Sequence, residues 1–279
     1  MGFLLVAGAA LLWSTGGIGI KGIPDPALKI AFFRSAIAAV ALWLYFRPRV
    51  WKWTPAFLIA LGSYAGCLVS FVVATKWTTA ANAIFLQYSG VVWVLLFSPL
   101  LLREPLRRRE AIAIVVAFAG IGLFFLGEFD LRGRAGDGVA LLSGVFFAAL
   151  VMSLRSERGA GAEAAVTYGN VLAAAVLFPF VASDLAPASG WSAAVLLFLG
   201  VFQIAGAYAL FVAGIKHVTA TEASLIGMLE PVANPVWVFL FLGERPTLFA
   251  LVGGSIVLAA VAWRTLGGRE PAVALPPPD

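Results

Sequence analysis

The sequence predicts an all-α integral membrane protein in which ten transmembrane helices form two inverted five-helix repeats around a central cavity. Three observations support this: the composition, a series of long apolar runs, and an internal repeat. Of the 279 residues, 62% are hydrophobic and 12% are charged, whereas soluble domains carry about 25% charged residues. Such an apolar composition argues against a soluble protein. The runs are uniformly apolar, which excludes a β-barrel, because barrel strands alternate apolar and polar residues.

Ten apolar runs are long enough to span a bilayer, which requires about 20 mostly apolar residues in a helix. Pro24 and Pro26 end the first run and Pro48 ends the second, because proline lacks the N–H that continues a helix. We predict helices at about residues 3–22, 28–46, 55–75, 80–102, 110–127, 138–154, 164–182, 191–214, 220–242 and 248–265. The short loops between them predict that sequence neighbours pack antiparallel.

The two halves of the chain resemble each other. A shift of 140 residues, with no gap, places Lys76 on Lys216, Thr79 on Thr219, Ala83 on Ala223 and Glu104 on Glu244. With five spans in each half, the second repeat is inverted relative to the first, an arrangement typical of transporters. We expect the repeats to cover residues 1–129 and 130–267, followed by a disordered Pro-rich cytoplasmic tail at 268–279.

Two helix starts carry a local signature. Thr219 and Glu222 form a capping-box pattern, in which each side chain satisfies a backbone N–H of the other. Thr79 and Asn82 occupy the matching positions in the first half. We therefore interpret Glu222 as a helix cap rather than a substrate ligand.

Basic residues are distributed unequally between the loops. With a cytoplasmic N-terminus, the cytoplasmic segments contain twelve lysines and arginines and the outer segments contain six. Positive residues concentrate in cytoplasmic loops. The distribution predicts that both termini are cytoplasmic, and it explains the net charge of +5 without a nucleic-acid partner.

Little in the sequence indicates an enzyme or a cofactor. The single cysteine, Cys67, lies in an apolar run and is interpreted as a packing residue, and the single histidine, His217, has no partners for a metal site. No glycine- and lysine-containing nucleotide loop is present. We expect no cofactor, a small-molecule substrate, the lipid bilayer as surroundings and a monomeric chain.

Several short motifs occur in register in the two halves. The first half contains Leu12-Trp13-Ser14, Arg34, Ala74, Ala80, Ala83 and Arg103-Glu104-Pro105-Leu106, and the second contains Leu229-Glu230-Pro231-Val232, Leu242-Gly243-Glu244-Arg245-Pro246 and Gly253-Gly254. With them the chain resembles the drug/metabolite transporter superfamily, specifically the ten-helix EamA-type exporters. Within it, the chain looks most similar to aromatic amino acid exporters of the YddG type. The resemblance implies export of amino acids or related metabolites across a bacterial inner membrane.

Substrate sites in such folds lie near the membrane midplane, where the repeats meet. Polar and aromatic residues predicted at this depth are the substrate-binding candidates: Trp13, Ser14, Tyr64, Gln87, Tyr88, Ser89, Gln203, Tyr208, Glu230 and Asn234. Gln87, Tyr88 and Ser89 are consecutive, so at least one should face a neighbouring helix, and we favour Gln87 for the cavity.

Glu230 is the most costly of these residues to place in a membrane. It either faces the cavity, where it binds a substrate ammonium or carries a proton, or it forms a structural hydrogen bond. Pro231 complicates this choice, because it leaves the carbonyl group of Gly227 without a helical partner. Both interpretations remain open at this stage.

Three further residues are candidates for a gate or vestibule. Arg34 could attract a carboxylate or could extend its charge to the membrane surface, and Tyr168 and Asn170 could line an inner gate. Glu104 and Glu244 are interpreted as structural ion pairs. The sequence thus favours a secondary transporter that works by alternating access. A multidrug or purine exporter of the same fold is the alternative, and a channel or a membrane-embedded transferase is less favoured.

Overall fold

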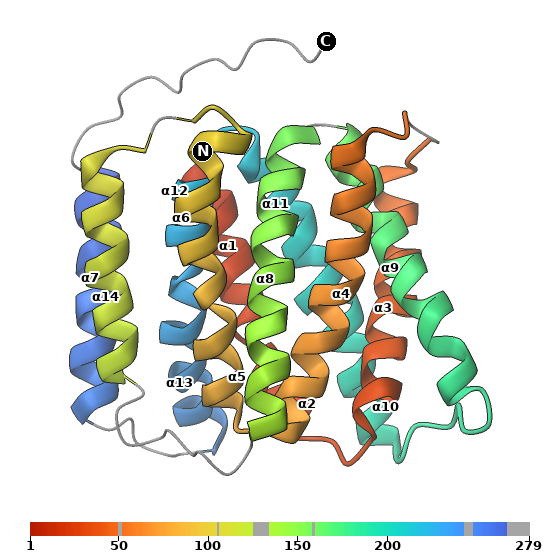
Figure 1. The fold of residues 1–279 in the computed structure, drawn as a ribbon. Coiled ribbons are helices and arrows are strands. Elements are labelled where there is room, and N and C mark those ends of the chain that lie inside the picture. Colours follow the sequence, from red (N-terminus) through yellow and green to blue (C-terminus); the bar gives the residue numbers. More distant parts are fainter. Residues whose placement is uncertain (50–51, 105, 125–133, 158–159, 243–247, 267–279) are drawn as a thin grey trace.

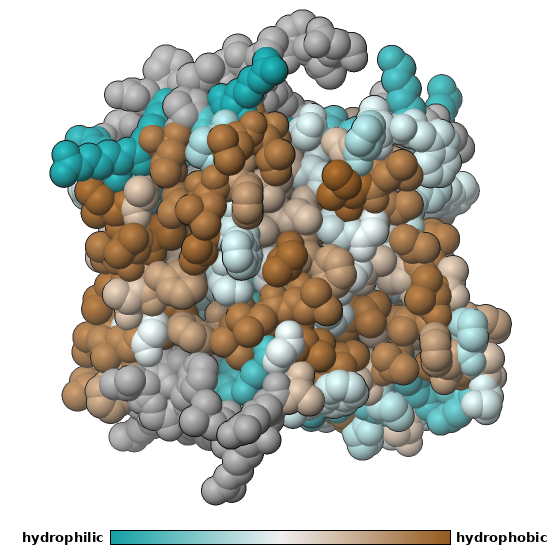
Figure 2. Space-filling model, in the orientation of Figure 1, coloured by the Kyte–Doolittle hydropathy of each residue, from teal (hydrophilic) through white to brown (hydrophobic). Residues whose placement is uncertain are grey.

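The computed structural model describes residues 1–49, 52–104, 106–124, 134–157, 160–242 and 248–266. The regular structure in this part of the chain is helical, and the helices run side by side as a bundle (Figure 1). Seven helices in it are long and apolar enough to cross a membrane. Figure 2 shows hydrophobic side chains across the middle of the visible face and hydrophilic ones towards its two ends. This is the surface of a multi-pass membrane protein.

The bundle has two ends, which we name by their residues. The N-terminal face contains Gly2 and His217, since a Cβ atom built on Gly2 would lie 2.6 Å from the Cβ of His217. The far face contains Lys21 and Thr78, since the Lys21 ammonium donates to the Thr78 carbonyl over 2.8 Å.

The first half of the chain forms seven helical segments. They are α1 (Gly2–Trp13), α2 (Gly16–Lys21), α3 (Ala27–Phe46), α4 (Pro55–Trp77), α5 (Ala80–Gln87), α6 (Ser89–Leu101) and α7 (Arg108–Phe124). The second half forms α8 (Arg134–Glu157), α9 (Ala160–Val181), α10 (Gly190–Phe198), the π-helix η2 (Leu199–Gly206), α11 (Ala207–Ile215), α12 (Ala220–Gly227), α13 (Leu229–Leu242) and α14 (Leu248–Leu266). The predicted runs overlap these segments, but four of the runs, 3–22, 80–102, 191–214 and 220–242, each contain more than one helical segment.

Three predicted helices are interrupted near their middles, and the residues explain two of the interruptions. Between α1 and α2, the hydroxyls of Ser14 and Thr15 bond the carbonyls of Leu11 and Leu12 at 2.6 and 2.7 Å, which competes with regular helix bonding. The α12–α13 interruption at Met228 precedes Pro231, which has no N–H to donate.

The α5–α6 interruption at Tyr88 has no proline beside it. Here the chain packs tightly instead: a Cβ atom on Gly90 would lie 2.5 Å from the Gly144 carbonyl oxygen of α8. The fourth predicted helix, 191–214, contains the π-helical turns of η2, a distortion that recurs at functional sites.

Both predicted helix caps are confirmed. The Thr219 hydroxyl accepts from the Glu222 backbone N–H, and the Glu222 carboxylate accepts from the Thr219 N–H, as a capping box requires. In the first half, Thr79 accepts from the Asn82 N–H at 3.0 Å. The two caps place α5 and α12 at positions that differ by the same 140 residues as the sequence repeat.

Two apolar clusters form the core. One lies towards the N-terminal face and contains residues such as Val6, Leu42 and Ile215. The other lies towards the far face and contains residues such as Ile30 and Leu199. Trp13 belongs to the first cluster and Tyr88 and Met228 belong to the second. The helix interruptions therefore lie where the two clusters meet, and we call this level of the bundle the middle layer. Helices α7 and α14 pair with each other at the edge of the bundle (Figure 1).

Candidate functional site

A small cavity of about 40 Å³ lies in the middle layer of the bundle. It is lined by Trp13, Arg34, Cys67, Leu68, Phe71, Gln87, Phe147, Gln203, Ile204, Tyr208 and Glu230. These residues come from both halves of the chain. A buried water needs roughly 10–15 Å³ of such space, so the cavity has room for a few waters and must enlarge to admit a metabolite.

The Tyr88 hydroxyl connects the two helix interruptions across the centre of the bundle. It donates to the Gly227 carbonyl at 2.5 Å and lies 2.9 Å from Oε2 of Glu230. The Gly227 carbonyl is available because Pro231 cannot donate to it, as the sequence predicts. Glu230 is 7% exposed and lines the cavity, so it makes a hydrogen bond to a neighbouring helix and also faces the cavity.

Arg34 lies on the cavity wall, and its burial excludes the alternative in which its charge reaches the membrane surface. The residue is 2% exposed, and its Nη2 donates to Oε1 of Gln203 at 2.7 Å. Gln203, in the π-helical segment, donates in turn to the Trp13 carbonyl at 3.2 Å. A Cβ atom on Gly16 would lie 2.7 Å from the Gln203 amide nitrogen, so only glycine leaves room for this contact.

A second polar group joins α5 to α4 and α8. The Gln87 amide donates to the Ser143 hydroxyl at 2.8 Å and lies 3.5 Å from the Cys67 sulfur. Gln87 faces the cavity, whereas Ser89 lies against α8, where a Cβ atom on Gly144 would be 2.6 Å from its hydroxyl. In the structure the polar triplet therefore divides between the cavity and a neighbouring helix.

Aromatic rings form one side of the cavity. The Trp13 and Tyr208 rings lie 5.0 Å apart, and Tyr64 packs on Tyr208 at 4.6 Å. The Asn170 amide donates to the Tyr64 hydroxyl at 2.7 Å. Tyr64 and Asn170 thus support the wall from behind rather than lining the cavity itself.

Two other predicted site residues, Ser14 and Tyr168, are not among the residues that line the cavity. Ser14 accepts a hydrogen bond from the Trp237 indole at 2.7 Å, and Tyr168 donates to the Pro48 carbonyl at 3.2 Å. The Asn234 side chain lies outside the part of the chain that the structure describes.

Five lining residues were not among the sequence candidates: Cys67, Leu68, Phe71, Phe147 and Ile204. Each is an apolar or weakly polar residue inside an apolar run, so nothing in the sequence distinguishes it from ordinary packing. Cys67, interpreted from the sequence as a packing residue, lines the cavity and contacts the Gln87 amide and the Ser143 hydroxyl.

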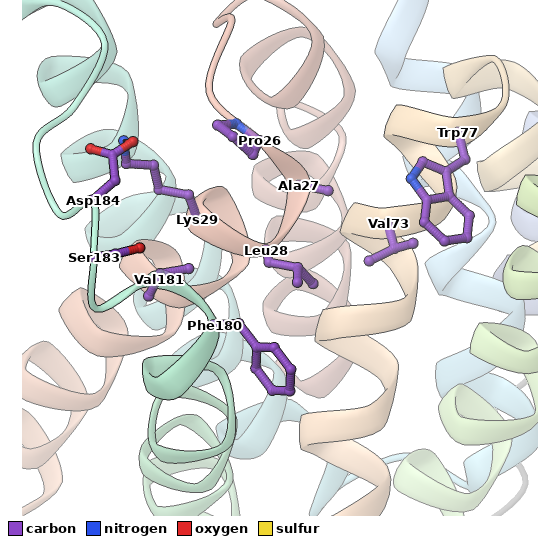
Figure 3. Close-up of a pocket in the computed structure, with 10 residues that line it drawn as sticks. All are labelled: Pro26, Ala27, Leu28, Lys29, Val73, Trp77, Phe180, Val181, Ser183 and Asp184. Carbon is purple, nitrogen blue, oxygen red and sulfur yellow. The ribbon is translucent and has the colours of Figure 1, made fainter.

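A larger hollow of about 460 Å³ lies at the far face, between α3, α4 and α9. Figure 3 shows Lys29 and Asp184 meeting at one end of it, with Phe180 and Trp77 further along. The two charged groups bond each other at 2.8 Å. The hydrogen bond from Lys29, together with its charge, lowers the pKa of the Asp184 carboxyl. Both charged lining groups already have a partner, so we favour the smaller central cavity as the site.

Buried ion pairs join helices at the N-terminal face. Glu104 bonds Arg155 at 2.7 Å and also accepts from the backbone N–H of Ala220, at the start of α12. Both side chains of the pair are at most 6% exposed, which confirms that Glu104 belongs to a structural ion pair. Arg264 similarly bonds Glu110 and Glu222 at 2.6 Å each. Glu244 lies outside the described residues.

Within the described ranges, no group of three or more His, Cys, Asp or Glu residues is arranged to hold a metal ion. The lining of the central cavity combines one buried guanidinium, one buried carboxyl, two amides and a set of aromatic rings.

Comparison with known proteins places this arrangement in a family. The EamA-like transporter family matches residues 1–126 and 134–266. A pseudopaline exporter, CntI, of Pseudomonas aeruginosa is 30% identical, with 84% of each chain covered. The threonine/homoserine exporter RhtA of Escherichia coli is 26% identical over 86% of this chain and 82% of its own length.

Two further relatives extend the match. An uncharacterized transporter of Archaeoglobus fulgidus is 25% identical over 92% of this chain and 95% of its own. A solved crystal structure superimposes with a TM-score of 0.77 at 19% identity, covering 96% of this chain and 99% of that one, which shows a shared fold. With a family match over nearly its whole length, the chain belongs to the EamA-like transporter family, whose members are transporters rather than enzymes.

Proposed function

We propose that this protein is a secondary transporter that exports small metabolites, with neutral amino acids as the preferred class, by alternating access through the central cavity. The observation that carries the proposal is the cavity itself. Buried charged, amide and aromatic groups from both halves converge at mid-bundle, where the helices are interrupted. Membrane proteins retain such costly groups mainly where substrates or ions pass.

The proposal includes ten membrane passes in two inverted repeats, covering residues 1–129 and 130–267. The pairs α5–α6 and α12–α13 support it, because their starts and interruptions correspond under the 140-residue shift. They run in opposite directions in the bundle (Figure 1). The family match in two blocks, 1–126 and 134–266, divides the chain near the same point.

Alternating access requires each face of the bundle to open in turn. The small cavity volume supports a contracted state between two open ones. The N-terminal face opens only if the Glu104–Arg155 pair separates, since this pair joins the loop after α6 to α8 and the start of α12. We therefore assign this pair to the closed form of that face.

We place the protein in a bacterial inner membrane, with both termini and the 268–279 tail in the cytoplasm. The twelve-to-six distribution of basic residues supports this orientation, as do the bacterial exporters among the relatives. A reporter fused to the C-terminus that is active only in the cytoplasm tests it. Activity of a periplasmic reporter at the same position contradicts it.

The substrate class rests on two observations. One of the named relatives exports threonine and homoserine, and the cavity combines opposite charges with aromatic walls. Aromatic amino acids, which the YddG-type resemblance implies, suit those walls. A multidrug or purine exporter of the same fold is the second candidate, favoured by the aromatic side of the cavity taken alone.

Counterflow in liposomes tests the proposal. Separate batches of vesicles containing the purified protein are loaded with unlabelled phenylalanine, threonine, adenine or a cationic dye, and each batch is diluted into the same solute carrying a label. We expect transient, saturable accumulation of the labelled amino acids. Accumulation of adenine or dye alone contradicts the amino acid assignment, and absence of counterflow with every solute contradicts a carrier.

A further inference from the structure

Arg34 and Glu230 place opposite charges on the wall of one cavity without pairing with each other. Both residues are described, and no Arg34 nitrogen lies within 4.0 Å of a Glu230 oxygen, the limit for an ion pair. Arg34 is 2% exposed and Glu230 is 7% exposed. Buried charges normally have a partner, so this separation needs an explanation.

Each group has binding capacity that the described residues do not use. Gln203 accepts from Nη2 of Arg34, while Nε and Nη1 have no partner among the described residues. Tyr88 contacts Oε2 of Glu230, and within the described part of the chain no hydrogen bond occupies Oε1. The unused donors and the unused acceptor both belong to residues of the cavity wall.

We propose that the cavity binds an α-amino acid zwitterion by its two charged ends, with Arg34 binding the α-carboxylate and Glu230 binding the α-ammonium group. This inference rests on the proposed function and defines its substrate by chemical class. A guanidinium is planar and carries several donors, which matches a carboxylate. A carboxylate is the matching acceptor for an ammonium group.

This arrangement selects for zwitterions. A simple amine would pair with Glu230 and leave Arg34 as an unpaired buried charge, and a simple carboxylic acid would leave Glu230 unpaired. Leaving a buried charge without its partner is strongly unfavourable. A zwitterion satisfies both groups and brings no net charge into the membrane, and its side chain can pack against Trp13, Phe147 or Tyr208.

Neighbouring residues orient the two charged groups. Gln203 packs against Gly16 and donates to the Trp13 carbonyl, and its carbonyl oxygen accepts from one end of the Arg34 guanidinium. Tyr88 holds one oxygen of Glu230 and is itself anchored on Gly227. We interpret Gln203 and Tyr88 as positioning residues.

The test uses three solutes with the same ring and different charged ends: phenylalanine, phenethylamine and 3-phenylpropionate. In wild-type liposomes we expect only phenylalanine to inhibit phenylalanine counterflow. Arg34→Gln should weaken inhibition by phenylalanine by about tenfold or more and bring phenethylamine to equal or greater potency. Glu230→Gln should make 3-phenylpropionate the relatively better inhibitor.

Arg108→Gln is the matched control, because it makes the same substitution at an exposed arginine and should leave the preference unchanged. If the variants are too unstable to assay, thermal denaturation of the wild type in detergent gives a second test. Phenylalanine should raise the midpoint, whereas the amine and the acid at equal concentration should not.

The outcomes separate this inference from the proposed function. Phenylalanine transport with an unchanged preference in both variants overturns the zwitterion site and leaves amino acid export intact. Equal stabilisation of the wild type by all three solutes also overturns the site. Absence of transport and binding of both phenylalanine and threonine in the wild type overturns both proposals.

Discussion

The two interrupted helix pairs, α5–α6 and α12–α13, share a backbone plan but contribute different chemistry. Each begins at a threonine cap, runs for eight residues and breaks after the same number of positions. At the break, the first pair contributes the side chains of Gln87 and Tyr88. The second contributes the bare Gly227 carbonyl and the Glu230 carboxyl.

Equivalent positions of α6 and α13 have different surroundings. Gly90 lies against the backbone of α8, and its counterpart under the repeat is Glu230, which lines the cavity. The two pairs are thus similar segments of opposite direction, while the different residues at their breaks decide which segment packs tightly against α8 and which lines the cavity.

The largest expected effect is at the tight contact of the first pair. In Gly144→Leu, the new side chain would begin 2.6 Å from the Ser89 hydroxyl and 2.7 Å from the Gln87 carbonyl, and the backbone there cannot yield without separating α6 from α8. We expect loss of monodisperse protein in size-exclusion chromatography. Gly62→Leu is the control, since no atom lies within 4 Å of a Cβ at that exposed glycine. Equal behaviour of the two variants would contradict the packing difference.

Removing the contact between the two pairs should have the next largest effect. Tyr88→Phe leaves the Gly227 carbonyl without its donor and frees Glu230, and an unsatisfied buried polar group costs about 1–3 kcal/mol. We expect a lower thermal midpoint and weaker phenylalanine counterflow. Tyr45→Phe, at a tyrosine 73% exposed, should change neither. An unchanged midpoint in Tyr88→Phe would show that the two breaks are not joined through this hydroxyl.

The two caps offer a matched comparison of smaller size. Loss of a threonine cap costs about 1 kcal/mol, so Thr79→Ala and Thr219→Ala should both lower the thermal midpoint modestly. The α12 start is also held by the Glu222 carboxylate and by Glu104, so we expect Thr219→Ala to cost no more than Thr79→Ala. A clearly larger loss at Thr219 would contradict this reading of the capping box.

The smallest effect concerns the ion pair of the far face, in which Lys29 is buried and the Asp184 carboxylate is exposed. The pKa of Asp184 is lowered in the folded state by Lys29, so its contribution to stability is present above the ordinary value of 3.8 and is lost as the pH falls through the lowered value. Asp184→Asn should therefore differ slightly in thermal midpoint from the wild type at pH 7 and converge with it at low pH. A difference that persists in acid would show that the charge is not responsible.

The sequence predicts the helical membrane fold and both caps, because long apolar runs and threonine caps are local signals. It also predicts that the Gly227 carbonyl has no donor within its own helix, because Pro231 has no N–H. The Tyr88 break and the π-helical segment depend on packing between distant helices, so no local pattern predicts them. Polar or aromatic character at midplane depth identifies five of the lining residues from the sequence: Trp13, Gln87, Gln203, Tyr208 and Glu230. Cys67 and Phe147 line the cavity only because of how the helices pack, so the sequence does not identify them. Arg34 lies near the start of its predicted helix, which favours a vestibule in the sequence analysis, whereas its place on the cavity wall depends on packing between helices.

Cys67 provides the most direct test of the central claim, that the middle cavity opens to each face in turn and holds the substrate. It is the only cysteine in the sequence, it lines the cavity and it is 3% exposed. A membrane-impermeant thiol reagent is applied to membrane vesicles of either orientation, with Cys67→Ser as the blank. We predict slow labelling from both sides that phenylalanine suppresses. Complete absence of labelling from one side, or labelling that saturating phenylalanine does not slow, would contradict the account.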